Sequence, residues 1–290
     1  PPVSSSRAMD CKCRLRRWRL AFPFCAMLEA LQVSRHPDKR DSDARSHIES
    51  VSFATSSAQV TVVVGARGSG KHSVLEVLAG ARRPDQGALL FHGRDLTRQP
   101  LHANELGVVI PGAADSLPGG LTVRETLASS LLLRVRGLSR EEIQSRLLNL
   151  LTLCGLETLA AEHVAGLSPV QHRRLLLACA LVSDPVLVLC QDFTFDMDAK
   201  AERELVALLK LVATDVPGRV VLNFTSSLTQ LPAYDSAVVL HEGHVCFHGP
   251  ARAISHYFNI KSVENLYPRL AMRPAARWGA HGVRHRGSYS

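Results

Sequence analysis

The sequence lacks paired cysteines, which would indicate a metal site, and a long apolar run, which would indicate a membrane span. Its seven cysteines are an odd number and form no C-x-x-C pair. Cys179 and Cys190 lie inside apolar runs, where a thiol behaves as a small hydrophobic side chain. These patterns predict a reducing compartment and no metal site. No apolar run reaches the roughly 18–20 residues that cross a bilayer, and the apolar segment 21–31 is interrupted by Pro23.

The net charge of +8 is not spread over the chain. Residues 1–20 carry six basic residues and one acid, and residues 269–290 carry five arginines and no acid, so the body between them is nearly neutral. We therefore expect two solvated basic tails and no nucleic-acid partner. The chain begins without methionine, so we expect it to be part of a longer protein.

Candidate strands and helices alternate along most of the chain. The apolar run 61–65 reads TVVVG, a pattern typical of a buried parallel strand. Helical periodicity follows in 121–135, 140–156, 169–185 and 199–213, and strand-like runs occur at 106–110, 186–190 and 219–224. Thr122 and Glu125 form the spacing of a capping box at the first of these helices. The alternation predicts an α/β fold built on a mostly parallel sheet.

The candidate site begins where the 61–65 strand ends. The stretch GARGSGKHS meets the phosphate-loop pattern G-x-x-x-x-G-K-[ST] at seven of its eight positions, and the eighth is histidine. Its glycines allow backbone N–H groups to face an anion at a helix N-terminus. The candidate nucleotide-binding residues are Gly65, Ala66, Arg67, Gly68, Ser69, Gly70, Lys71, His72 and Ser73.

Five motifs in order give the chain a resemblance over 27–258 to the ATP-binding cassette of ABC transporters. After the phosphate loop come LTVRETL at 121–127, GLSPVQHRR at 166–174, VLVLCQDFTFDMD at 186–198 and HEGHVCFHGP at 241–250. LTVRETL is most similar to the white-type (G) subfamily. The resemblance implies a P-loop NTPase core with an antiparallel β subdomain and a helical signature subdomain at about 118–182. Basic tails at 1–26 and 259–290 would flank this domain.

In this family ATP lies between two cassettes, and the resemblance assigns each catalytic role to a position. The metal-binding aspartate of the Walker B motif falls on Gln191 and the catalytic glutamate on Asp192. A one-residue slip would instead make Asp192 the metal ligand and leave Phe193 as the base. Either register leaves one carboxylate for two tasks. His72 stands where a hydroxyl holds Mg²⁺, which prefers oxygen ligands, so we expect impaired metal binding.

The remaining motifs also depart from the family. The signature retains Leu167, Ser168 and Gln171, but Pro169 and Val170 replace its two glycines, removing an N–H and adding bulk. Thr225 replaces the switch histidine, and 109–116, where the Q-loop belongs, has no glutamine. The adenine-stacking aromatic is also absent, with Arg35 or His36 in its place. Asp198 retains the D-loop aspartate.

These departures affect nucleotide chemistry and leave the apolar pattern intact. We therefore predict a cassette that binds ATP, couples to transport at the cytoplasmic face of a membrane, and hydrolyses ATP poorly. Its partners would be a second cassette and a transmembrane domain, supplied by another chain or by a further part of this one. The alternatives are a regulatory pseudo-ATPase scaffold that dimerises with an active cassette, and a competent ATPase in which Asp192 alone holds the metal.

Overall fold

The computed structural model describes residues 26–36, 47–110, 117–275 and 277–278. The predicted tail at 1–26 therefore lies almost entirely outside the described residues, as do most of the loop at 109–116 and the end of the chain beyond 278.

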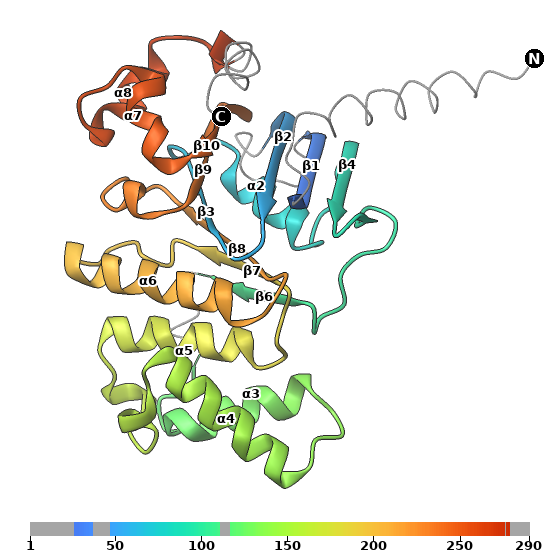
Figure 1. The fold of residues 1–290 in the computed structure, drawn as a ribbon, viewed down its shortest axis with the longest axis vertical. Helices are drawn as coiled ribbons and strands as arrows, with labels where there is room; N and C mark the ends of the chain where they lie inside the picture. Colours follow the sequence, from blue (N-terminus) through green and yellow to red (C-terminus); the bar gives the residue numbers. More distant parts are fainter. Residues whose placement is uncertain (1–25, 37–46, 111–116, 276, 279–290) are drawn as a thin grey trace, which may run out of the picture.

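A six-stranded sheet forms the centre of the molecule (Figure 1). Its order is β10-β9-β3-β8-β7-β6, and all neighbours are parallel except the β9–β10 hairpin. The strands are β3 (Val60–Val64), β6 (Leu106–Val109), β7 (Leu187–Gln191), β8 (Val220–Thr225), β9 (Ser236–His241) and β10 (His244–Pro250). The mostly parallel sheet that the sequence predicted is thus confirmed.

A second, antiparallel sheet has the order β2-β1-β4-β5. Its strands are β1 (Ala26–Arg35), β2 (Ile48–Ser56), β4 (Gln86–Phe91) and β5 (Arg94–Asp95). Helix α2 (Lys71–Leu78) packs with this sheet through buried apolar side chains that include Val74 and Leu75.

The helical part of the molecule is formed by α3 (Val123–Arg134), α4 (Arg140–Cys154) and α5 (Pro169–Leu181), and α6 (Ala199–Asp215) lies between these helices and the central sheet (Figure 1). Helices α3, α4 and α5 each begin with a capping box, at Thr122, Ser139 and Ser168 respectively. The predicted cap at Thr122 is therefore confirmed, because its side chain accepts from the Glu125 amide while Glu125 accepts from the Thr122 amide. Shorter helices, α7 (Ile254–Phe258) and α8 (Leu266–Ala271), follow the last strand.

Two hydrophobic cores lie on opposite faces of the central sheet. Along β3, Val62 and Val64 belong to the core that includes α5, α6 and the helical part, whereas Val63 belongs to the core shared with α2. This division follows from the two-residue period of a strand, which sends alternate side chains to opposite faces. A strand buried on both faces explains why 62–64 is apolar throughout.

The end of the described chain differs from the sequence prediction of a solvated basic tail. Residues 259–278 include α8, whose Leu266 and Leu270 are buried, and Trp278 is 5% exposed. The prediction is wrong for this segment because Leu266 and Leu270, one helical turn apart, pack into the core. Its arginines are therefore not all free in solvent. Arg273 stacks on the Trp278 ring, 5.3 Å from its centroid.

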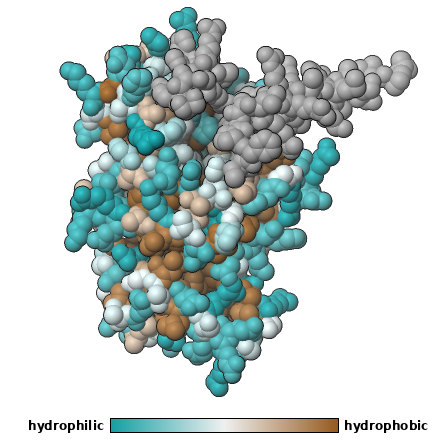
Figure 2. Space-filling model, in the orientation of Figure 1, coloured by the Kyte–Doolittle hydropathy of each residue, from teal (hydrophilic) through white to brown (hydrophobic). Residues whose placement is uncertain are grey.

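The surface carries hydrophobic patches over the helical half of the molecule (Figure 2). Large exposed apolar side chains there are Leu132, Leu133, Leu148 and Leu211. No helix among the described residues is both long enough and apolar enough to span a bilayer.

Candidate nucleotide-binding site

The loop between β3 and α2 curls back tightly on itself. Gly65 has no room for a side chain, since a Cβ there would lie 2.3 Å from Ser69 Oγ and 2.6 Å from the Leu240 carbonyl oxygen. Gly70 precedes α2 with φ of 93°, a left-handed conformation that glycine adopts without strain. The sequence motif therefore has the local geometry that a phosphate loop requires.

Neighbouring segments brace this loop from outside. The Gly243 amide, in the β9–β10 turn, donates to the Ser69 carbonyl (3.1 Å), and the Glu49 amide donates to the Gly243 carbonyl (2.9 Å). The loop is thus held by the hairpin turn and, through that turn, by β2.

Lys71 lies over the loop and near one carboxylate. Its ammonium group donates to the carbonyl oxygens of Gly65 and Ala66. Burial lowers the pKa of Lys71, and the nearby charge of Asp192 raises it. Burial likewise raises the pKa of Asp192, whereas Lys71 lowers it. The structure therefore brings the predicted lysine and the predicted catalytic carboxylate into electrostatic contact.

Asp192 also lies beside the end of β8. Its amide donates to the Phe224 carbonyl (2.6 Å), and the nearby Ser226 amide, the charge of Arg173 and the Thr225 side chain lower the pKa of its carboxyl. One carboxylate oxygen, Oδ1, is buried without a hydrogen-bond partner among the described residues. An oxygen in this state is available to a ligand or a water molecule.

The register of Gln191 follows from the alternation of β7. Leu187 and Leu189 belong to the core shared with α2, whereas Val188 and Cys190 belong to the opposite core. Gln191 therefore lies on the face that α2 covers, and its buried Oε1 has no partner in the described part of the chain. This placement favours the register in which Gln191 holds the metal position and Asp192 follows it.

The residues at this site do not fit a magnesium ion. His72 is 61% exposed, and its Nε2 lies 3.7 Å from Glu76 Oε1, one helical turn away. Ser73 is fully buried in α2. Gln191 is neutral, and no group of three or more His, Cys, Asp or Glu side chains suited to a metal occurs among residues 26–36, 47–110, 117–275 and 277–278. We therefore derive no chemical step through Mg²⁺.

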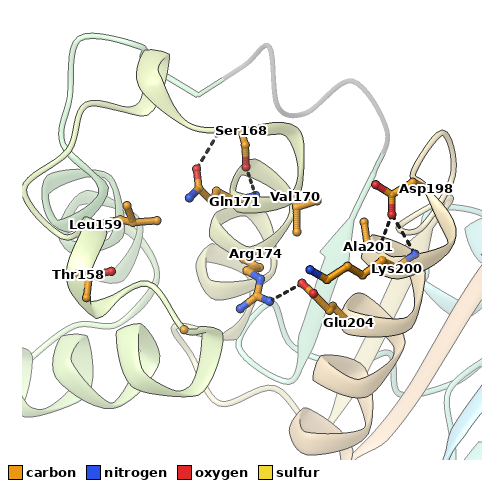
Figure 3. Close-up of a pocket in the computed structure, with 11 residues that line it drawn as sticks. Thr158, Leu159, Ser168, Val170, Gln171, Arg174, Asp198, Lys200, Ala201 and Glu204 are labelled. Carbon is orange, nitrogen blue, oxygen red and sulfur yellow. Dashed lines mark hydrogen bonds and ion pairs between the residues drawn. The ribbon is translucent and has the colours of Figure 1, made fainter.

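The predicted signature and D-loop residues meet in a second place, a groove of about 460 Å³ between α5 and α6. Ser168, Gln171 and Asp198 all line it (Figure 3). Arg174 of α5 and Glu204 of α6 point toward one another across it, with 3.4 Å between Nη2 and Oε2. The structure thus separates the predicted residues into a phosphate-loop cluster and a signature groove.

Two polar side chains that line this groove, Ser168 and Asp198, cap the helices that form it. Ser168 caps α5: its hydroxyl accepts from the Gln171 amide, and Gln171 Oε1 accepts from the Ser168 amide (2.8 Å). Asp198 caps α6 by accepting from the amides of Lys200 and Ala201 (2.9 and 2.8 Å). Leu167, the remaining signature residue, is buried in the core.

Residues 48–194 match the family model described as ABC transporter. The chain belongs to the ABC transporter family. The family and the fold that the sequence resemblance implied are thus confirmed.

Curated relatives of this cassette are sulfate/thiosulfate import ATP-binding proteins. Those of Mycobacterium bovis and Thermosynechococcus vestitus are 33% and 31% identical over 198 residues, which is 68% of this chain and 55% and 58% of theirs. The chain therefore spans about half the length of the curated relatives it matches. These relatives are named as importers and not as white-type proteins.

Solved structures share the fold of the cassette at low sequence identity. CbiO1 of Clostridium perfringens, part of an ABC transporter complex, aligns with a TM-score of 0.72 and 20% identity, over 89% of this chain and 99% of that one. A dimeric ATP-binding cassette bound to ADP and Pi aligns with a TM-score of 0.63 and 22% identity, over 78% and 99%.

The two residues predicted as possible stacking partners for adenine, Arg35 and His36, differ in exposure. Arg35 is 4% exposed, with its guanidinium 3.7 Å from Glu76, so it presents no open face for a base to stack on. His36 is exposed, and its backbone amide donates to Asp85 (2.7 Å).

Two residues near Asp192 were not predicted from the sequence. Arg173 falls on the arginine of the signature pattern L-S-G-G-Q-x-R, but the sequence assigned it no role at the site. Tyr267 comes from α8, and its hydroxyl donates to the Ser226 carbonyl (2.8 Å). Only the fold brings α8 to this site, because 75 residues separate Tyr267 from Asp192 in the sequence.

Proposed function

We propose that this chain is a nucleotide-binding cassette that holds ATP at residues 65–73 and hydrolyses it slowly or not at all. The observation that carries the proposal is the glycine loop with Lys71 at the start of α2, facing Asp192 as the one carboxylate beside it. ATP, when bound, supplies the β–γ phosphate bond whose hydrolysis drives transport in this family.

The roles of the chain's own groups follow from their chemistry. The amides of 66–71 would donate to phosphate oxygens at the N-terminus of α2. Lys71 would neutralise phosphate charge, and Asp192 would accept a proton from the attacking water. Asp192 is one methylene shorter than the usual glutamate, and neither Gln191 nor His72 supplies the charge or hydroxyl expected at the metal. Binding is therefore retained, and hydrolysis is the weakened step.

We propose that the cassette works at the cytoplasmic face of a membrane with a second cassette and a transmembrane domain. The family assignment and the apolar surface of α3 and α4 support a protein partner. The motif at 121–127 supports a white-type transporter, whereas the names of the curated relatives support an importer of sulfate or thiosulfate. A full-length transcript with six apolar spans after residue 258 would favour the white type.

A regulatory scaffold is the second candidate function. The capping box of α5 supports it, because the Ser168 amide and hydroxyl are both engaged within their own helix. Pro169 has no N–H to offer a phosphate on a partner cassette. Such a cassette would dimerise with an active partner without completing the partner's site.

The first prediction concerns binding. Wild type should bind a fluorescent ATP analogue with similar affinity with and without Mg²⁺, and Lys71→Ala should weaken that binding about tenfold or more, because hydrogen bonds from a charged group contribute about 1.5–3 kcal/mol. Fluorescence titration measures both affinities. Arg83→Ala, which removes one positive charge at an exposed position after α2 and outside the loop, is the matched control.

Two results would contradict this proposal. Equal and undetectable binding by wild type and Lys71→Ala would leave the scaffold as the better account. Phosphate release at rates typical of active transporters, about 1 per second or faster, and lost in Asp192→Asn, would show a competent ATPase instead.

A further inference from the structure

The segment after the last strand lies against the nucleotide-binding site, although the family match ends at residue 194. Helix α8 packs into the core through Leu266 and Leu270. Between them, Tyr267 projects its hydroxyl toward the strand ends where the phosphate loop begins.

Tyr267 contacts the segment 225–227, which we call the switch segment. Its hydroxyl donates to the Ser226 carbonyl (2.8 Å), and the Gly65 amide lies close enough to lower the pKa of the same hydroxyl. Val64, which precedes Gly65, pairs with Thr225 in the central sheet. Gly65 opens the phosphate loop. One phenol group therefore joins the switch segment to the phosphate loop.

The switch segment in turn holds the candidate catalytic carboxylate. The Ser226 amide and the Thr225 side chain lie close enough to Asp192 to lower its pKa. The Asp192 amide donates to the Phe224 carbonyl (2.6 Å), and the Ser227 amide donates to Thr225 Oγ1 (3.1 Å). Tyr267 thus acts on Asp192 through Ser226. Burial raises the pKa of Tyr267, the Gly65 amide lowers it, and the negative charge of Asp192 raises it further, in keeping with a neutral donor beside this carboxylate.

A second connection runs from the same C-terminal segment to the other side of the loop. The Ala275 amide donates to Glu242 Oε2 (3.4 Å) in the β9–β10 turn, and the next residue of that turn, Gly243, donates to the Ser69 carbonyl (3.1 Å). The segment 266–278 therefore contacts the supports of the phosphate loop at two separate points.

We propose that Tyr267 is a positioning residue of the nucleotide site, and that the segment 266–278 couples its own packing to nucleotide binding by holding the switch segment against the phosphate loop. This inference rests on the proposed function, because it assigns α8 a part in the same nucleotide site. Phosphate entering the loop would act on Gly65 and Asp192, and both are joined to Tyr267 directly or through one residue.

The test compares two phenol hydroxyls of the same C-terminal region. Tyr267→Phe removes the donor to Ser226 and should weaken binding of the fluorescent ATP analogue about 3- to 10-fold, the loss expected for one hydrogen bond. Tyr257→Phe is the comparison, because the Tyr257 hydroxyl contacts the same segment at the Trp278 carbonyl (3.5 Å) and not at the switch segment. Its affinity should fall by less than that of Tyr267→Phe.

A spectroscopic measurement on wild type tests the same contact in a chain whose fold no substitution has changed. The chain has four tyrosines, so uniform 3-fluorotyrosine labelling gives a simple fluorine NMR spectrum that the two Phe variants assign. ATP should shift the Tyr267 signal and leave the Tyr257 signal in place. A residue that only stabilises the fold would show no such shift.

The outcomes separate the two proposals. If wild type binds nucleotide but Tyr267→Phe binds equally well and the Tyr267 signal does not move, the inference is overturned and the proposed function stands. If neither wild type nor Lys71→Ala binds nucleotide, the proposed function fails and the inference fails with it.

Discussion

At the residue scale, the site contains buried polar oxygens that have no hydrogen-bond partner in the part of the chain that the structure describes. Gln191 Oε1 and Asp192 Oδ1 are both buried without a hydrogen-bond partner in the described ranges. Such atoms cost free energy in the folded state. Their retention beside Lys71 supports a site organised for a ligand.

The buried carboxyl group of Glu202 lies beside the switch segment and predicts a pH dependence. It is 3% exposed, and its Oε1 accepts from the Ser227 hydroxyl (2.8 Å). Burial raises its pKa above the ordinary value of 4.5, although Ser227 and Thr229 lower it. A raised pKa means that the folded state binds the proton more tightly, so this contribution is fully present below pH 4.5 and is lost as pH rises through the folded pKa.

Glu202→Gln removes this ionisation and keeps an acceptor oxygen. The free energy of unfolding of the variant, relative to wild type, should therefore increase from pH 4.5 toward pH 8, which urea unfolding at several pH values measures. Glu204→Gln, an exposed change two residues along the same helix, should show little such trend. A constant difference between Glu202→Gln and wild type would contradict the prediction.

At the element scale, the helices are specified by local signals. Thr122 illustrates this, because its capping box satisfies two amides that the first turn of α3 would otherwise leave unpaired. Ser168 and Pro169 do the same for α5, with proline at the first helical position, where no N–H is needed. Pro169, which replaces a glycine of the signature pattern, is thus a favourable residue at the start of this helix.

Thr122→Ala should lower the free energy of unfolding by about 1 kcal/mol, the usual value of an N-cap side chain. Chemical denaturation followed by circular dichroism measures the change. Thr152→Ala, at an exposed position inside α4, should be neutral or slightly stabilising because alanine has the higher helix propensity. Equal decreases in the free energy of unfolding for both variants would show that the N-cap hydrogen bond does not stabilise the protein.

At the scale of the whole molecule, the C-terminal segment is part of the folded domain. Trp278 packs edge-on against Phe258, with ring centroids 5.3 Å apart, and its indole N–H donates to the Leu270 carbonyl (3.2 Å). Arg269 and Arg273 lie over its ring. Basic residues that the sequence suggested were solvated therefore cover an aromatic cluster.

Trp278→Ala should destabilise the protein by about 3–5 kcal/mol, as expected for removing a buried tryptophan. The loss should appear in urea unfolding of the full chain. Met272→Ala, at a side chain 69% exposed in the same segment, should change stability by less than about 0.5 kcal/mol. A Trp278→Ala variant as stable as wild type would show that this segment does not belong to the core.

Much of this cassette was predictable because its signals are local. The phosphate loop, the cap at Thr122 and the strand 61–65 each depend on residues close together in the sequence, and strand–loop–helix order then implies the sheet. The face of the sheet on which Gln191 lies could be assigned only from the alternation of side chains along β7. The exposure of His72 could be assigned only from the orientation of α2.

The sequence by itself determined the family and the α/β order, since residue type and spacing are enough for these, and it predicts which groups each motif lacks. The tertiary structure alone decided that Asp192 lies near Lys71, that Ser168 and Asp198 share a groove, and that Tyr267 reaches the switch segment. Those contacts join residues far apart in the chain, and they depend on how apolar faces pack and not on any local pattern.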